Sequence, residues 1–221
     1  MKSKKRLGKR IGKGMLIACA MAAVMAVGGI SAYFTAADAK DNTWTVGNID
    51  IQLLEPQYDE SESERVNITP NKELTKDPQI QNKGNNDAFV FLKVTVPKAD
   101  VKVAAQDNKT VAQSMQELFD YNIDSNWTLV KTETGDTADT HIYVYGTESK
   151  CTALAPGATT SVLFKDGKIK FKNVVEGQGL DKTTLEMPVE AFAIQTTDLA
   201  GTGTTNPAEV WALLEGNTAS N

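Results

Sequence analysis

Few side chains in this 221-residue chain could do chemistry. His141 is the only histidine, and Cys151 lies ten residues further along the chain. A cysteine and a histidine can serve as nucleophile and base, but nothing around either residue indicates that it is activated. A catalytic zinc ion normally takes three protein ligands, and the chain has no His-Glu-x-x-His motif. We therefore expect no catalytic residue and no metal ligand, and we expect His141 to be an exposed residue at a strand end.

Other chemical motifs are equally weak. The acidic run Asp59–Glu64 could hold a calcium ion loosely, but it lacks the alternating oxygen ligands and the turn glycine of a calcium loop. The sequence contains no Gly-x-Ser-x-Gly, phosphate-binding loop or dinucleotide fingerprint. We expect an exposed loop over residues 57–65, and we expect no cofactor.

The N-terminus has the three parts of a secretory signal peptide. A head with seven cations and no acid, Met1–Lys13, precedes an apolar run, Met15–Val27, and then small residues up to Ala32. We predict a signal peptide over residues 1–32, cleaved between Ala32 and Tyr33. The protein would then act outside the cell and contact the membrane only before cleavage. The alternative is that the apolar run is retained as an anchor, because it is at the lower edge of a spanning length.

Removal of the signal peptide changes the charge of the chain. The remaining 189 residues carry 16 basic and 28 acidic side chains, a net charge of −12. Such an acidic surface repels nucleic acid and anionic lipid, so we expect no nucleic-acid partner. Cys19 leaves with the signal peptide, and Cys151 then has no partner within the chain. We expect a buried or unremarkable thiol and a fold that depends on its packed core.

The mature sequence is typical of many short strands. Runs of Thr, Val and Ile alternate with Gly, Pro, Asn and Asp, and residues 88–96 alternate most clearly. Residues 127–133 and 141–145 predict a hairpin, whereas 110–121 and 209–214 predict short helices. The second helix is preceded by Asn206, a capping residue, and by Pro207 at the first helical position. These patterns indicate an all-β protein, an antiparallel β-sandwich of jelly-roll type with one or two short helices. We expect this domain over residues 49–215, after an N-terminal segment 33–48 and before a flexible tail, 216–221.

Three stretches of the sequence resemble one family. They are Gly29–Thr35 with the following Asn42–Ile51, the Lys-Asp-x-x-x-x-Asn-x-Gly pattern within Leu74–Gly84, and the late segments 191–195 and 208–211. In these stretches the chain is similar to the TasA, CalY and camelysin family of Gram-positive bacteria. Residues 101–179 are only diffusely similar.

The resemblance implies an exported protein of the cell surface or biofilm matrix, processed by a SipW-type signal peptidase. Family members polymerise into fibres in which the freed N-terminal segment of one subunit completes a sheet of the next. Here that donor strand would be residues 33–48, and the partners would be further copies of the chain and other matrix or surface proteins. The alternative is that residues 33–48 form an ordinary first strand of their own domain.

Two other functions remain open at this point. Camelysin is described as a surface metallopeptidase, which the resemblance alone supports because the sequence has no zinc motif. The chain could also be a surface adhesin or a minor subunit of a fibre.

Overall fold

The computed structural model of the chain describes residues 38–39, 42–43, 48–104, 113–180 and 183–218. The chain divides into two compact units, Met1–Val46 and Gly47–Asn221. In the first unit, strands β1 (Asp38–Ala39) and β2 (Asn42–Thr43) pair with each other. The predicted signal peptide, its cleavage position between Ala32 and Tyr33, and most of segment 33–48 lie outside the described residues.

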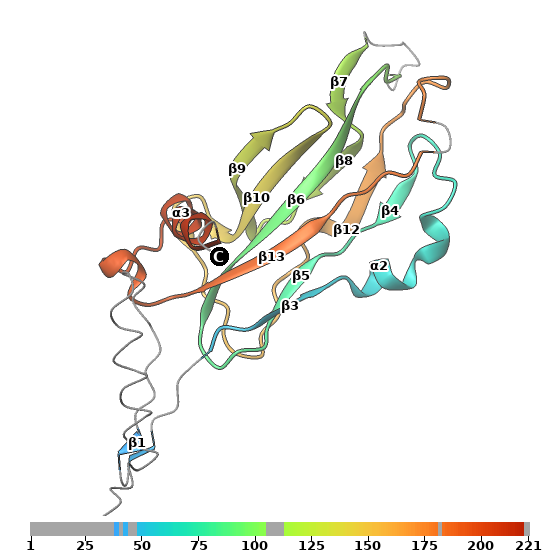
Figure 1. Cartoon of the computed structure of the whole chain (residues 1–221). Coiled ribbons are helices and arrows are strands. Elements are labelled where there is room, and N and C mark those ends of the chain that lie inside the picture. The colour runs from blue at the N-terminus through green and yellow to red at the C-terminus, as the bar shows by residue number, and fades with distance from the viewer. Residues whose placement is uncertain (1–37, 40–41, 44–47, 105–112, 181–182, 219–221) are drawn as a thin grey trace, which may run out of the picture. The chain divides into compact units, whose positions relative to one another are not determined.

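The larger unit is built around one main antiparallel sheet (Figure 1). Its longest strand, β6, pairs on one side with β10 and on the other with β13, and β9 extends the sheet beyond β10. Two short strands, β7 and β11, pair with the ends of β6 and β10. The bounds are β6 (Ala88–Val101), β7 (Ser114–Glu117), β9 (Trp127–Thr134), β10 (Ala138–Thr147), β11 (Lys150–Cys151) and β13 (Val189–Gln195).

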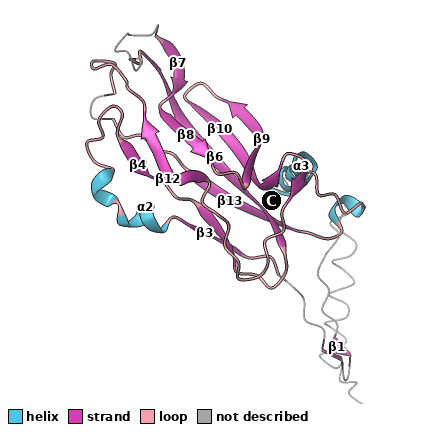
Figure 2. Ribbon diagram, turned by 180° about the vertical axis from the view of Figure 1, so that it is seen from behind, coloured by secondary structure: helices cyan, strands magenta, loops and turns pink. Residues whose placement is uncertain are grey.

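A second layer of strands covers one face of the main sheet (Figure 2). It contains the antiparallel group β4-β12-β8 and the antiparallel pair β3-β5. Their bounds are β3 (Ile51–Leu54), β4 (Glu73–Thr75), β5 (Gln79–Asn82), β8 (Phe119–Ile123) and β12 (Phe164–Phe171). The predicted all-β, antiparallel fold with short helices is therefore confirmed.

Strand β6 contributes to two hydrophobic cores. Because side chains alternate along a strand, Val90, Leu92, Val94 and Val96 face the core between the two layers. Phe89 and Phe91 face the opposite side and belong to the core under the C-terminal helix. This is the separation of faces that the alternation in residues 88–96 predicts.

The C-terminal helix α3 (Pro207–Thr218) begins where the sequence indicates. The Asn206 side-chain oxygen accepts hydrogen bonds from the backbone N–H of Ala208 (3.0 Å) and of Glu209 (3.3 Å), which is a regular N-cap. The Trp211 ring lies 5.4 Å from the rings of both Phe91 and Phe192. The helix runs four residues beyond its expected end at Leu214.

No helix in the described part of the chain is long and apolar enough to cross a membrane.

The prediction of a helix over residues 110–121 is wrong for the part that the structure describes. Strands β7 and β8 occupy it, and short η and α helices lie elsewhere. Phe119, Tyr121 and Ile123 alternate toward the sandwich core, whereas Met115 is 52 % exposed. The apparent helical spacing therefore does not define one buried face.

The expected loop over residues 57–65 is also wrong. It contains helix α2 (Pro56–Glu60) and the 3-10 helix η1 (Glu62–Glu64). Pro56 occupies the first turn, where a missing N–H costs nothing. The Asp77 carboxylate, from the connection between β4 and β5, accepts hydrogen bonds from the N–H groups of Gln57 and Tyr58, each at 3.0 Å. The cap comes from a distant residue, so the local sequence does not reveal it.

The double burial of β6 generates a stability prediction. Leu92 is fully buried between the layers, whereas Leu129 on β9 is 50 % exposed. We expect Leu92→Ala to lower the free energy of unfolding by about 2–5 kcal/mol, because it removes buried methylene groups and leaves a cavity. Leu129→Ala, the same chemical change, should cost far less. Urea unfolding of both variants checks this, and equal losses would contradict the assignment of the core.

Candidate functional site

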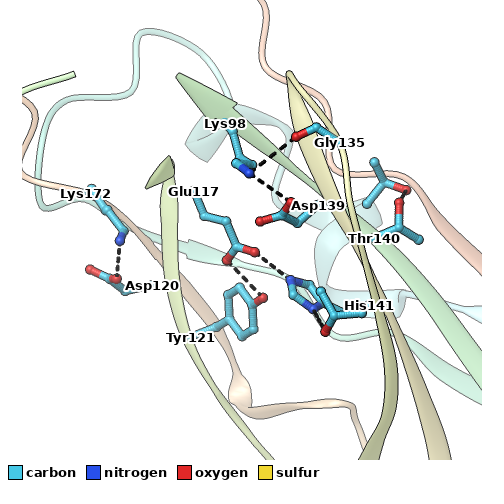
Figure 3. Close-up of polar contacts among 11 residues, drawn as sticks. Lys98, Glu117, Asp120, Tyr121, Gly135, Asp139, Thr140, His141 and Lys172 are labelled. Carbon is cyan, nitrogen blue, oxygen red and sulfur yellow. Dashed lines mark hydrogen bonds and ion pairs between the residues drawn. The ribbon is translucent and has the colours of Figure 1, made fainter. Parts of the chain in front are cut away.

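A polar cluster joins the two layers around His141 (Figure 3). His141 on β10 places its Nε2 2.5 Å from a carboxylate oxygen of Glu117 on β7. The other carboxylate oxygen of Glu117 accepts a hydrogen bond from the Tyr121 hydroxyl on β8, at 3.3 Å. On the opposite side of the ring, His141 Nδ1 lies 3.0 Å from the Thr132 hydroxyl on β9. One imidazole and one carboxylate thus connect four strands.

The His141–Glu117 pair is largely shielded from water, and the neighbouring tyrosines are buried as well. The side chains of His141 and Glu117 are only 13 % and 22 % exposed. Burial raises the pKa of Tyr143, the next tyrosine along β10, to about 12. Burial and the neighbouring Tyr143 also raise the pKa of Tyr121. Both hydroxyls therefore stay neutral at physiological pH and act as hydrogen-bonding groups.

His141 is not the exposed strand-end residue that we expected. It lies within β10, and its neighbours on that strand place it on the face that covers the core between the layers. The Tyr143 ring centroid is 6.2 Å from the His141 ring. Glu117, its partner, lies within the segment that the sequence predicted to be a helix. A wrong secondary-structure prediction therefore hid the contact.

Cys151 and His141 are not brought together. Cys151 is buried in the other core, under α3, where its neighbours include Leu199 and Trp211. Burial raises the pKa of the thiol to about 12, so the nucleophilic thiolate is scarce at neutral pH. The expectation of a buried thiol is confirmed.

A set of buried charges lies next to β4, and the sequence did not predict it. Lys76 and Asp77 are 6 % and 0 % exposed, and they immediately follow β4. The Lys76 ammonium lies 2.8 Å from the Glu55 carboxylate and 4.4 Å from the centre of the Tyr58 ring. Asp77 caps α2, as described above. The only sequence signal for this role is the Lys-Asp pair of the motif within Leu74–Gly84.

The acidic run is used structurally at its end. A Glu64 carboxylate oxygen accepts hydrogen bonds from the Thr75 hydroxyl (2.9 Å) and from the Thr75 N–H (3.1 Å). These bonds lower the pKa of Glu64. They fasten η1 to β4.

The two lateral edges of the sandwich differ. The polar cluster links the layers near β8 and β9. At the other edge lie β3 and β13, which contact each other across the two layers. We call this edge the open seam. In the described part of the chain, β3 pairs only with β5, and β13 pairs only with β6.

The open seam is lined by apolar side chains that are only partly buried. They pack against the sandwich core from both sides: Ile51 and Leu53 on β3, with Ile49 just before it, and Val189, Ala191 and Ala193 on β13. No residue of β13 is fully buried, in contrast to its neighbour β6. The seam therefore combines free strand edges with incompletely covered apolar surface, which favours the addition of another strand.

A comparison with protein families gives one match. A family model described as camelysin metallo-endopeptidase matches residues 6–174. Neither the curated proteins nor the solved structures contain a match.

The description of this family implies a metal ion, so the ligand chemistry needs a test. Within the described ranges, no three His, Cys, Asp or Glu side chains come together as a metal-binding group. Both ring nitrogens of His141 already have partners, Glu117 and Thr132. The described residues therefore do not fit a resident metal ion.

The polar cluster generates a prediction about coupling. In a double-mutant cycle, Glu117→Ala and His141→Ala should show a coupling energy of about 0.5–3 kcal/mol, because each side chain loses its partner in a shielded site. Urea unfolding of the two single variants and the double variant measures it. The Lys93–Glu190 pair, whose side chains are 30 % and 53 % exposed, is the control. Its coupling should be at most about 1 kcal/mol. Additive effects at Glu117 and His141 would contradict the cluster.

A second prediction concerns alkaline pH. The pKa of Tyr143 is about 12 in the folded protein and about 10 in the unfolded chain. Above pH 10 the unfolded chain releases this proton first, so stability falls as pH rises from 10 toward 12, by at most about 1.4 kcal/mol per pH unit. Unfolding free energies of the wild type and Tyr143→Phe at pH 9, 10 and 11 check this. The unfolding free energy of the variant should fall less than that of the wild type between pH 9 and pH 11. Equal falls would contradict the raised pKa of Tyr143.

Proposed function

The chain belongs to the camelysin metallo-endopeptidase family, and we propose that it is a secreted structural protein of the bacterial cell surface or biofilm matrix. The open seam is the observation that carries this proposal. A sandwich with two free strand edges and half-covered apolar surface along one side is suited to receive a further strand. Completing the seam would bury the apolar surface and satisfy the free backbone groups.

The segment we propose to complete the seam is residues 33–48 of a second copy. In an extended chain, Trp44 and Val46 fall on one face, while Thr43 and Thr45 fall on the other. Such a strand would present an apolar side to the sandwich core and a polar side to solvent. Cleavage between Ala32 and Tyr33 by a SipW-type signal peptidase would free the segment after export.

The polar cluster supports the choice of this seam. At the edge near β8 and β9, the Glu117 carboxylate already joins His141 on the main sheet to Tyr121 on the second layer, so an incoming strand would have to displace these contacts. At the open seam, the lining is apolar. A strand added there exchanges water for apolar contact and for backbone hydrogen bonds.

The proposed contact is head-to-tail, because the segment and the seam are different parts of the chain. Such a contact does not close on itself and generates filaments. Further copies of the chain are thus the proposed partners, and other matrix or surface proteins could join by the same mode. An adhesin or a minor subunit would differ in one observable respect, since its purified form would not grow filaments alone.

The family description favours a second candidate, a secreted peptidase. The Thr132 hydroxyl, the His141 ring and the Glu117 carboxylate stand in the order of a nucleophile, a base and an orienting acid. A peptidase function would therefore place its chemistry in the polar cluster. Casein cleavage that Thr132→Ala and His141→Ala both abolish, and that a chelator leaves intact, would support this arrangement and would count against a purely structural role. Cleavage that a chelator abolishes would indicate a metal-dependent enzyme instead.

Deletion of residues 33–46 tests assembly. The remaining unit keeps both described layers and the open seam, so we expect a folded monomer that no longer forms filaments. Electron microscopy and light scattering of the mature and truncated proteins measure this. A synthetic peptide of residues 33–48 should bind the truncated protein, and a peptide of the same composition in scrambled order should not.

Two results would overturn this mode of assembly. One is unchanged filament growth after the deletion, which would show that the segment is dispensable. The other is a truncated protein that folds with the circular dichroism of the mature form but binds the scrambled and native peptides equally.

A further inference from the structure

We infer that the turn Asn82–Asn86, which we call the junction turn, positions the assembly segment by holding the backbone of residues 48–50 to the folded domain. The inference rests on the proposed function, because it concerns the place where segment 33–48 leaves the sandwich. It assigns a role to the Asn-x-Gly end of the motif within Leu74–Gly84.

Four hydrogen bonds join the junction turn to residues 48–50. The Asn48 N–H donates to the side-chain oxygen of Asn85 at 2.7 Å, and the Asn85 N–H donates to the Asn48 carbonyl at 3.4 Å. The Asp50 carbonyl accepts from the N–H groups of Lys83 (2.8 Å) and Gly84 (3.0 Å). The chain is therefore fixed before β3 begins at Ile51.

The junction turn is itself held rigidly. The Asn82 side chain is fully buried, and its amide donates to the carbonyls of Asn86 and Leu154, each at 2.8 Å. Its side-chain oxygen accepts from the Gly84 N–H at 3.0 Å. A buried amide donor or acceptor without a hydrogen-bond partner costs free energy. These bonds therefore fix the turn in one conformation.

Gly84 is required by the close approach of the two backbones. A Cβ atom at this position would lie 2.5 Å from the Asn48 carbonyl oxygen and 2.9 Å from the Asp50 nitrogen. Both neighbours are backbone atoms, which cannot move aside as a flexible side chain can. The glycine thus serves the contact between the turn and residues 48–50.

Holding residues 48–50 favours assembly by preorganisation. A strand that must enter a neighbouring seam loses conformational entropy when it binds. If its base is already fixed, fewer residues remain to be ordered, and the affinity rises without any new contact. Asn85 is the best residue to test, because its side chain is exposed and serves this contact through one oxygen.

The test compares Asn85→Ala with Asn85→Asp in the mature protein. Alanine removes the oxygen that accepts from the Asn48 N–H, whereas aspartate keeps an oxygen there and is the matched control. In Asn85→Ala we expect an unchanged melting temperature, faster hydrogen exchange at Asn48, and filament growth slower by about fivefold, the factor that one ordinary hydrogen bond carries. Asn85→Asp should stay close to the wild type in all three measurements.

The outcomes separate this inference from the proposed function. Wild-type exchange at Asn48 in Asn85→Ala would overturn the junction turn as a restraint. Faster exchange with wild-type filament growth would overturn its role in assembly. If the wild-type protein itself forms no filaments, the proposed function fails, and the role of the junction turn in assembly falls with it, while the exchange rates still decide whether it restrains residues 48–50.

Discussion

The structure depends on one strand that is buried on both of its faces. Strand β6 supplies Val90, Leu92, Val94 and Val96 to the core between the two layers, and it supplies Phe89 and Phe91 to the core under α3. Antiparallel sheets commonly leave one face to solvent, but here the second layer covers one face and the helix covers part of the other. The other strands of the main sheet are arranged around β6. The two strands next to it differ, because β10 also pairs with β9, whereas β13 pairs with no further strand of the described part of the chain.

That asymmetry gives the two lateral edges of the sandwich different character. At one edge, the Glu117 carboxylate links His141 on the main sheet to Tyr121 on the second layer, and a strongly polar pair with little exposure is costly to separate. At the other edge, β3 and β13 have one strand partner each within the described residues, and their apolar side chains are only partly buried. Proteins usually protect such an edge with charge, proline or a covering element. An edge that stays apolar is best explained by an interaction that covers it, which is why the proposed function assigns the open seam to a second copy of the chain.

The sequence was a good guide where a pattern is local. Alternation over residues 88–96 located the central strand and its two faces, and the Asn206–Pro207 pair located the start of α3. It failed where a distant contact decides the local structure. Helix α2 forms because Asp77 caps it from another segment, and the expected helix over residues 110–121 is replaced by strands that pair with β6 and β12. The polar cluster could not be predicted for the same reason, since Glu117 and His141 meet only through the pairing of three strands. A resemblance to the family pointed to residues 74–84, but only the contacts show what those residues do.

Those contacts also bear on the chemistry that the family description suggests. In many enzymes, buried charged residues mark the site of reaction. Here Lys76 and Asp77 are the most deeply buried charges among the described residues, and both are engaged in fastening α2 to the strands. Asn82 and Gly84 of the same motif hold residues 48–50 by backbone contacts. The motif is therefore explained by the fixing of segments 48–50 and 55–58, which flank β3 on either side. A strand fixed at both ends keeps its outer edge in place, and a fixed edge is what the addition of a further strand requires.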